Sequence, residues 1–257
     1  MNAAITLWNK QMSKLSGEET FGLLIQPILW VVLFGVGMKG VMGSAVPGGD
    51  DFYIAFMAPG IVALSALGGA IAGGSVWLDE RMRGIVKEYL VAPIPRLSIL
   101  LGNTFTIVTK SLFQAIVIFV IGVLMGAQIA NNPPGWVGGI LLVAGYSIGF
   151  AGIALALASK TNDPGAYHAV IFLLNLPLLF LSNALYPLSS LPQWMQIGAR
   201  INPTSYVVDG LRQLVLTNGN GLASGELLPL WQCAVAIILF ATLGMWLAYV
   251  AFRSAIR

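Results

Sequence analysis

The densest group of charged side chains lies between Asp79 and Leu90, in the segment DERMRGIVKEYL. Pro93 and Pro95 follow this segment and would stop a helix. We predict a short amphipathic helix over 79–93, with an apolar side that comprises Met82, Ile85, Val86 and Tyr89. Basic residues alone can anchor such a helix at a membrane surface, but the added acids and the apolar side favour a docking element for a partner protein. The candidate docking residues are Glu80, Arg81, Arg83, Gly84, Lys87 and Glu88.

A second polar group lies inside a long apolar run and consists of Asn103, Thr106, Lys110 and Gln114. Their spacing of three, four and four residues places them on one face of a helix. A charge at mid-membrane costs about 2.5–3.5 kcal/mol on insertion scales, so Lys110 either extends its side chain to the membrane surface or lines a polar cavity. Asn175 and Asn183 flank Pro177 in a later run, where they either satisfy a bent helix or contribute to the same polar lining.

A third group follows the fifth apolar run. We predict two short external helices within 189–217 that dip into the outer leaflet. An amide residue followed by proline is a typical start for the second of them. Its acid and base, three residues apart, can form an ion pair. The candidate residues of these external helices are Trp194, Asn202, Pro203, Tyr206, Asp209 and Arg212.

Catalytic motifs are not evident in the sequence. It has no G-x-x-x-x-G-K-[ST] phosphate-binding loop, no HExxH motif and no Ser/His/Asp set. One cysteine and one histidine rule out a disulfide framework and a multi-ligand Cys/His metal site. We therefore expect no catalytic residue, no metal and no cofactor on this chain. His168 is interpreted as a solvated loop residue and Cys233 as a small packing residue.

The elements that must position these groups are transmembrane helices. Of the 257 residues, 57% are hydrophobic and 9% are charged, against about 25% charged in a soluble domain. This composition excludes a soluble enzyme, a disordered regulator and a nucleic-acid binder. A helix that spans a bilayer needs about 20 apolar residues. Six apolar runs are near or above this length and are too long for barrel strands, so they predict six helices. The runs are Phe21–Met38, Phe52–Leu78, Leu97–Ile129, Trp136–Ser159, Ala169–Leu188 and Pro229–Phe252.

Lysine and arginine predict the orientation of these six spans, because cytoplasmic loops carry the excess. The side of the termini would hold Lys10, Lys14, Arg81, Arg83, Lys87, Arg96, Lys160, Arg253 and Arg257. The opposite side would hold only Lys39, Arg200 and Arg212, so both termini are expected to be cytoplasmic. The first apolar run begins late and reaches span length, which does not fit a cleavable signal peptide.

The sequence divides into three parts by this reasoning. Residues 1–20 form an amphipathic interfacial helix, in which Ile5, Trp8, Met12 and Leu15 recur at helical spacing, although this segment could also extend the first span. Residues 21–252 form the six-span domain and 253–257 a cytoplasmic tail. Small residues at four-residue spacing, such as Ser65-Gly69-Gly73 and Gly145-Gly149, predict close helix packing.

Two segments resemble the type-2 ABC transporter permeases of bacterial export systems, which include drug-resistance and nodulation-factor exporters. The first is Glu80-Arg81-x-x-Gly84-x-x-x-Glu88-x-Leu90-x-x-Pro93-x-x-Arg96. The second comprises Leu185-Tyr186-Pro187, Leu191-Pro192-x-Trp194 and Asn202-Pro203-x-x-Tyr206-x-x-Asp209-x-x-Arg212. With the six-span layout and the amphipathic start, the resemblance covers nearly the whole chain. One departure is Ile85-Val86-Lys87, where family members often have Thr-Leu-Glu.

The resemblance implies a permease in the bacterial plasma (inner) membrane. A second copy, as a homodimer, or a related chain would complete the pathway. Two separate ATP-binding subunits would hold the ATP and Mg²⁺, and the helix over 79–93 would be the coupling element on those subunits. The external helices would form a lid over the dimer, which makes their six candidate residues the predicted lid residues.

Export of a hydrophobic or amphipathic small molecule or lipid is the function that we favour from the sequence. Trp30, Phe34, Phe172 and Phe180 either line such a path or merely face lipid. Lipid-linked polysaccharide export is an alternative, because the family also performs it. An ion-coupled transporter would normally carry acids within its spans, and the six runs contain none. A membrane enzyme would need catalytic side chains that the sequence does not offer.

Overall fold

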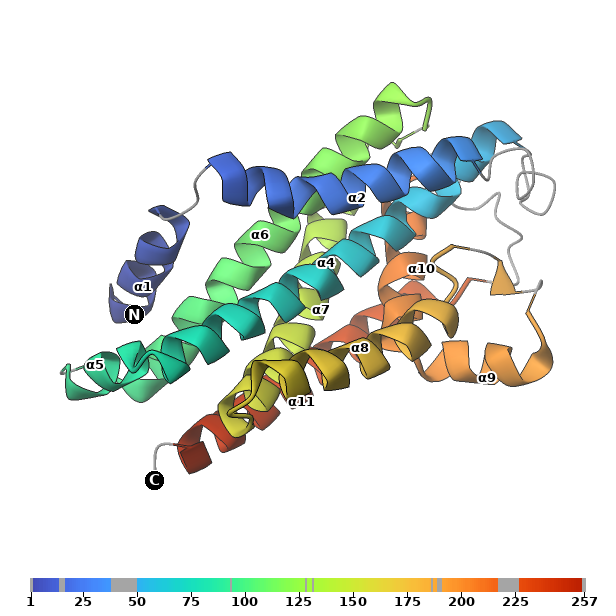
Figure 1. Cartoon of the computed structure of the whole chain (residues 1–257). Helices are drawn as coiled ribbons and strands as arrows, with labels where there is room; N and C mark the ends of the chain where they lie inside the picture. The colour runs from blue at the N-terminus through green and yellow to red at the C-terminus, as the bar shows by residue number, and fades with distance from the viewer. Residues whose placement is uncertain are drawn as a thin grey trace.

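The computed structural model describes residues 2–13, 17–37, 50–92, 94–127, 129–130, 132–185, 187–188, 191–216 and 227–255. The helices in these ranges are α1 (Asn2–Ser13), α2 (Gly17–Gly37), α4 (Asp50–Met82), α5 (Ile85–Val91), α6 (Arg96–Leu124), α7 (Pro133–Lys160), α8 (Pro164–Phe180), α9 (Gln193–Ile201), α10 (Pro203–Val215) and α11 (Leu230–Ala255) (Figure 1). The described residues contain no strand, apart from an isolated bridge between Ile129 and Leu216. The all-helical class predicted from the sequence is thus confirmed for these ranges.

Four of the helices are long and apolar enough to cross a membrane, and they lie in α4, α6, α7 and α11. Two shorter apolar helices, Phe21–Gly37 and Pro164–Phe180, lie in the two remaining runs. At 1.5 Å per residue the 17 residues of α8 extend about 26 Å, a few Å less than a hydrocarbon core of about 30 Å. The chain is therefore a multi-pass membrane protein with four full-length spans and two shorter apolar helices.

The early end of α8 has a local cause. Pro177 lies in its last turn, and the last carbonyl groups of a helix have no partner within it. The Asn202 side chain supplies the missing donors, because its Nδ2 donates to the carbonyl oxygens of Leu178 at 2.9 Å and Leu181 at 2.6 Å. Asn202 thus satisfies carbonyl groups at the end of α8.

Glycines allow α7 and α11, the pair of helices with the most extensive mutual contact, to approach closely. A Cβ atom on Gly244 of α11 would lie 2.2 Å from the carbonyl oxygen of Gly149 of α7, and one on Gly145 would lie 2.7 Å from a methyl carbon of Ile237. On α4, a Cβ atom on Gly73 would lie 2.3 Å from Ile107 of α6. The small-residue spacing therefore predicted real points of contact.

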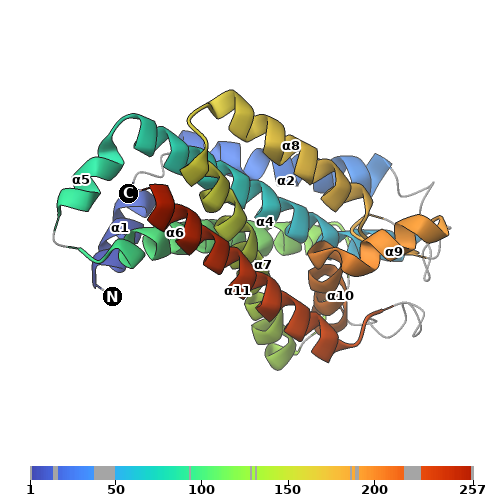
Figure 2. The ribbon, with the colours of Figure 1, turned by 90° about the horizontal axis from the view of Figure 1, so that it is seen from below.

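Helix α4 lies at the centre of the bundle and packs against α2, α6, α7, α8 and α10. Every residue from Tyr53 to Ala63 is buried, as expected for a helix with neighbours all round. In both views the two termini and α5 gather at one end of the molecule, and α9 and α10 lie at the other (Figures 1 and 2). We refer to the first as the α5 end.

The predicted boundary of the N-terminal helix differs from the observed one. Helix α1 stops at Ser13 and α2 starts at Gly17, so residues 17–20 belong to α2 and not to the N-terminal helix. The two short helices predicted within 189–217 correspond to α9 and α10, which lie within that range. Several residues named above fall outside the described ranges, namely Lys14, Leu15, Met38, Lys39, Pro93, Tyr186 and Arg257.

Candidate functional site

The segment predicted as one helix over 79–93 is divided by a turn at Arg83 and Gly84. Residues up to Met82 continue α4, and α5 begins at Ile85. Gly84 has a φ of 81°, a left-handed conformation that glycine adopts without the strain of a side chain. The turn also breaks the predicted apolar side, because Val86 is buried whereas Met82 is 55% exposed.

The charged residues of this segment fall into two sets. Arg83, Lys87 and Glu88 are exposed, and Arg83 pairs with Asp79 at 2.9 Å on the surface. Such an exposed pair contributes about 0–1 kcal/mol. Glu80 is buried, and Arg81 points inward. Only part of the predicted docking set therefore faces outward.

Arg81 holds the end of α4 against the end of α7. Its guanidinium donates to the carbonyl oxygen of Ala158 at 2.8 Å and also to the Ser159 carbonyl and the Asn162 side chain. The carbonyls at a helix C-terminus are unsatisfied and carry partial negative charge, so a cation is favourable there. Trp77, one turn earlier, donates to the Ser159 hydroxyl at 3.2 Å.

Helix α1 connects α5 with α6. Lys10 Nζ lies 3.0 Å from the Tyr89 hydroxyl on α5, and Trp8 Nε1 donates to Thr109 Oγ1 of α6 at 3.0 Å. Gly102 permits the approach, because a Cβ atom there would lie 2.9 Å from Leu7 Cβ. The bond to Tyr89 raises the pKa of Lys10 above 10.5, aided by the charges of Glu80 and Glu88. Sequence reasoning missed these contacts, because they join residues about 80 to 100 positions apart.

A small cavity of about 120 Å³ lies between α1, α2, α4 and α6, and we call it the charged cavity. It brings together three residues of the predicted polar face of α6 with a buried acid; its polar lining is Gln11, Glu80, Asn103, Thr106 and Lys110. Gln11 donates to the Asn103 side chain at 2.7 Å. Lys110 lines this cavity together with Asn103 and Thr106.

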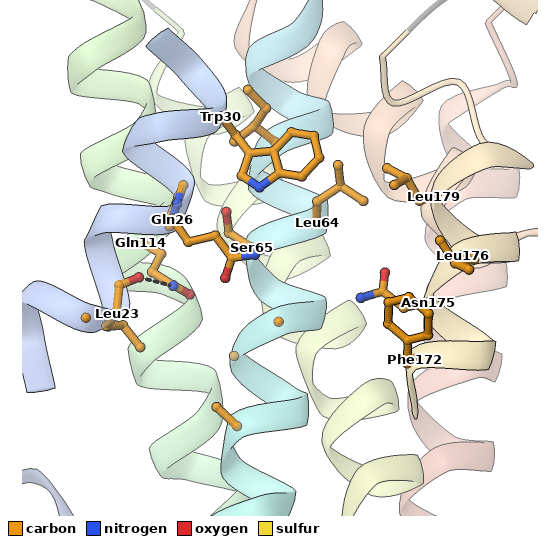
Figure 3. A pocket seen from close by; sticks show the side chains of 16 residues that line it. Leu23, Gln26, Trp30, Leu64, Ser65, Gln114, Phe172, Asn175, Leu176 and Leu179 are labelled. Carbon is orange, nitrogen blue, oxygen red and sulfur yellow. Dashed lines mark hydrogen bonds between the residues drawn. The ribbon is translucent and has the colours of Figure 1, made fainter. Parts of the chain in front are cut away.

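A larger cavity of about 290 Å³ lies between α2, α4, α6 and α8, and we call it the amide cavity (Figure 3). Its polar side chains are all uncharged: Gln26, Ser65, Gln114 and Asn175. Trp30 also lines it and stacks on Phe34, with ring centroids 4.9 Å apart. Leu23, Gly69 and Ala72 line both this cavity and the charged one, so the two lie next to each other.

A third cavity of about 300 Å³ lies on the other side of α8, against α4, α7 and α11, and we call it the apolar cavity. Its lining includes Ile171, Leu174 and Phe240, and it shares Asn175 with the amide cavity. Cavities of this size are at the lower end of small-molecule sites, which measure about 300–1,000 Å³. The amide cavity and the apolar cavity leave α8 flanked by space on both sides.

Two of the predicted lid residues, Asp209 and Arg212, belong to a buried polar cluster. Asp209 and Arg212 are almost fully buried and lie 3.7 Å apart, which confirms the predicted pair. Arg212 also donates to the carbonyl oxygens of Phe56 at 3.1 Å and Asn183 at 2.8 Å, and its guanidinium lies over the Phe56 ring. Asn183 donates to Asp209, so it belongs to this cluster and lines none of the three cavities.

The other lid residues separate by exposure. Trp194 on α9 is 67% exposed, whereas Asn202 is buried and accepts the Thr204 amide at 2.9 Å as a helix cap, with Pro203 as the first helical residue. Tyr206 donates to the Arg200 carbonyl at 2.6 Å. His168 lies within α8, where its ring is 3.3 Å from the Ser75 hydroxyl, so the predicted loop position was wrong. Cys233 is buried, as predicted.

Comparison with known proteins defines the family. The model of the ABC-2 type transporter family matches residues 2–216, which include α1 to α10 and most of the lining of the three cavities. The chain belongs to the ABC-2 type transporter family.

Named relatives of this ABC-2 chain are transport permeases. It is 31% identical to the transport permease ycf38 of Cyanophora paradoxa, over 87% of this chain and 79% of that protein. It is 22% identical to the daunorubicin resistance ABC transporter permease protein DrrB1 of Streptomyces coeruleorubidus, over 84% and 75%. It is 25% identical to the inner membrane transport permease YadH of Escherichia coli K12, over 74% and 73%. These likenesses support a transport subunit that is not itself an enzyme.

Proposed function

We propose that this chain is the membrane-spanning permease subunit of an ATP-driven exporter, paired with a second copy and powered by two separate ATP-binding subunits. Family membership supports the transport role. The sequence contains no phosphate-binding loop, so nucleotide chemistry is assigned to the partner. Both termini would be cytoplasmic, and the E. coli relative named as an inner membrane permease supports a plasma-membrane location.

The observation that carries this proposal is that α4 is one continuous helix from Asp50 to Met82. This 33-residue helix leads directly into the turn before α5, and its residues line all three cavities. A force on the exposed residues of α5 would therefore reach the cavity walls through one packed helix. The ATP-binding subunit would bind Arg83, Lys87 and Glu88, and Arg81 would transmit the movement of α4 to α7.

The proposed cargo is a hydrophobic or amphipathic small molecule or a lipid. The amide cavity offers uncharged polar groups, and the apolar cavity beside it offers only aliphatic, aromatic and proline contacts apart from Asn175. A relative named for resistance to daunorubicin supports export of a small molecule of this kind.

The test is coupling between α5 and ATP hydrolysis in the complete complex. The chain would be co-purified with its ATP-binding subunit, and ATPase activity would be measured in lipid vesicles. The swap Lys87→Glu/Glu88→Lys should lower activity about two- to fivefold, because exposed ion pairs are worth up to about 1 kcal/mol. Arg253→Glu, which changes an exposed base at the same end of the molecule, is the matched control and should leave activity unchanged.

Two results would contradict the proposal. One is an ATPase rate that no change among the exposed α5 residues alters. The other is transport by the purified chain without any nucleotide.

A further inference from the structure

The amide cavity contains a buried hydrogen-bond acceptor that the protein leaves unused. Gln114 Nε2 donates to the Leu23 carbonyl at 2.8 Å, and this bond fixes which way the amide faces. Gln114 is only 4% exposed, and its Oε1 has no hydrogen-bond partner within the described residues. Leaving such an acceptor unpaired costs free energy, so a group that donates to it would gain affinity.

Gly69 keeps this acceptor accessible. A Cβ atom at Gly69 would lie 3.3 Å from Gln114 Oε1 and 3.3 Å from Ser111 Oγ, and the Ser111 oxygen is likewise buried without a partner among the described residues. Because Gly69 itself lines the cavity, a side chain at this position would fill the space in front of both oxygens.

Three more uncharged polar side chains face the same space. Gln26 from α2 and Asn175 from α8 extend toward α4 from opposite walls, with Ser65 between them (Figure 3). Within the described residues, none of these three side chains makes a hydrogen bond to another protein group. Their donors and acceptors are therefore available to a ligand.

Charge is confined to the neighbouring charged cavity. Among the described residues, no Asp, Glu, Lys, Arg or His lines the amide cavity, whereas Glu80 and Lys110 line the charged one. A charged headgroup in the amide cavity would lose its hydration and find no counter-charge. A neutral headgroup with hydroxyl or amide donors would meet groups of matching polarity.

The apolar cavity adjoins the amide cavity at Asn175, which lines both of them. The cavity on one side of α8 therefore has several polar groups, whereas the cavity on the other side has none apart from Asn175. Phe172 and Trp30 add apolar surface at the amide cavity itself. A ligand with a polar headgroup and an apolar chain fits this arrangement.

We propose that the amide cavity binds the uncharged, hydrogen-bonding headgroup of an amphiphile, with Gln114 and Asn175 as specificity-determining residues and part of its chain lying against Trp30 and Phe172. This inference rests on the proposed transport function and narrows its substrate class from amphiphiles in general to neutral ones whose headgroup carries hydroxyl or amide donors.

The first experiment compares three probes with the same photoreactive dodecyl chain and different headgroups: a neutral glucamide, a trimethylammonium and a sulfate. The full chain would be placed in phosphatidylcholine nanodiscs, and photolabelling would be titrated for each probe. The glucamide probe should bind at least about tenfold more tightly than either charged probe, and its label should map to 22–30 and 172–179. Equal or tighter binding of a charged probe would overturn the proposal.

The second experiment changes the headgroup contacts. Asn175→Leu and Gln114→Leu should each weaken glucamide binding about three- to tenfold, consistent with one lost hydrogen bond. Asn175→Asp should instead strengthen binding of the trimethylammonium probe. Gln232→Leu, an amide on α11 that lines none of the three cavities, should leave all three affinities unchanged.

The design separates this inference from the broader function. Gln114→Leu also removes the bond to Leu23, so Asn175→Leu keeps the test valid if the first variant fails to fold. Because binding is measured without the ATP-binding subunit, loss of coupling to ATP would contradict the transporter role and leave the headgroup result standing. Unchanged glucamide binding in Asn175→Leu would overturn the headgroup inference alone.

Discussion

Single side chains at the ends of helices determine how the bundle is held together. Arg81 satisfies carbonyl groups at the end of α7, and Asn202 does the same for α8. Arg212 joins α10 to α4 through the Phe56 carbonyl. Sequence patterns identified all three as notable polar residues, but their partners lie 21 to 156 positions away and could not be inferred from local spacing.

Arg81 and Arg83 make a matched pair for a stability test. Arg81→Ala should lower stability by about 2 kcal/mol, because hydrogen bonds from a charged donor are lost. In a chain of this size that is a fall of about 4–8 °C in Tm, measured by thermal unfolding in detergent. Arg83→Ala removes only a surface pair and should change Tm by about 2 °C or less. Equal shifts in the two variants would contradict the anchoring role of Arg81.

The buried Asp209–Arg212 pair predicts strong coupling between two substitutions. Asp209→Ala removes the acid that pairs with buried Arg212 in this cluster. It should lower the free energy of unfolding by about 3–5 kcal/mol. Asp209→Leu/Arg212→Met should be less destabilising than Asp209→Ala, because neither charge remains. Thermal unfolding and the yield of monodisperse protein would report both effects. A double variant at least as unstable as the single one would show that the pair is not the main contribution.

At the scale of helices, long apolar runs were predictable and turns between them were not. Each of the six runs contains a helix, because burial of backbone groups in lipid requires one. The turn at Gly84 was missed because one glycine within a helical pattern is usually tolerated. The docking of α1 on α6 was missed because its amphipathic pattern fits a membrane surface equally well.

Docking of α1 depends on the absence of a side chain at Gly102. Gly102→Val should displace α1, because a Cβ atom there already meets Leu7 at 2.9 Å. Trypsin cleavage at Lys10 should become about tenfold faster if opening is favoured by about 1.4 kcal/mol. Gly37→Ala, at a helical glycine with no neighbouring atoms within 4 Å, is the control. Unchanged cleavage in Gly102→Val would contradict tight docking.

The contact between α1 and α5 also predicts a pH dependence. The bond to Tyr89 raises the pKa of Lys10 above its usual 10.5. Its contribution to stability is therefore fully present below pH 10.5 and is lost as the pH rises through the higher folded-state pKa. Protection of Lys10 from trypsin should stay constant between about pH 7 and 9. In Lys10→Met, which lacks the trypsin site, chymotrypsin cleavage after Trp8 should show no increase at more alkaline pH. A decline in wild-type protection within the lower range would contradict this contact.

At the scale of the whole molecule, the second copy that we propose would pack over the open side of the amide cavity. Gln26 lines this cavity and is also exposed on α2 among apolar residues, where a polar amide in contact with lipid is unfavourable. A partner surface over Gln26 and the exposed Phe172 would remove it from lipid. Gln114 and Asn175 could be anticipated as polar lining from the sequence, but the contribution of Gln26 on α2 required the three-dimensional arrangement.

Cross-linking tests this placement of the second copy. In a Cys233→Ser background, Gln26→Cys should form a disulfide-linked dimer in membranes treated with an oxidant, because the two copies would meet near this residue. Leu239→Cys, on the exposed side of α11, should remain monomeric on a non-reducing gel. Dimers from Leu239→Cys and none from Gln26→Cys would place the interface on α11 instead.

The short length of α8 links this protein to its host bilayer. With its last carbonyls tied to Asn202, α8 cannot lengthen to follow a thicker membrane. Lipids must then thin locally or the helix must change its tilt, and hydrophobic mismatch of this kind costs fractions of a kcal/mol per Å. Helix α8 forms a wall of both the amide cavity and the apolar cavity. The acyl-chain length of the surrounding lipids would therefore act on the same cavity walls as the cargo.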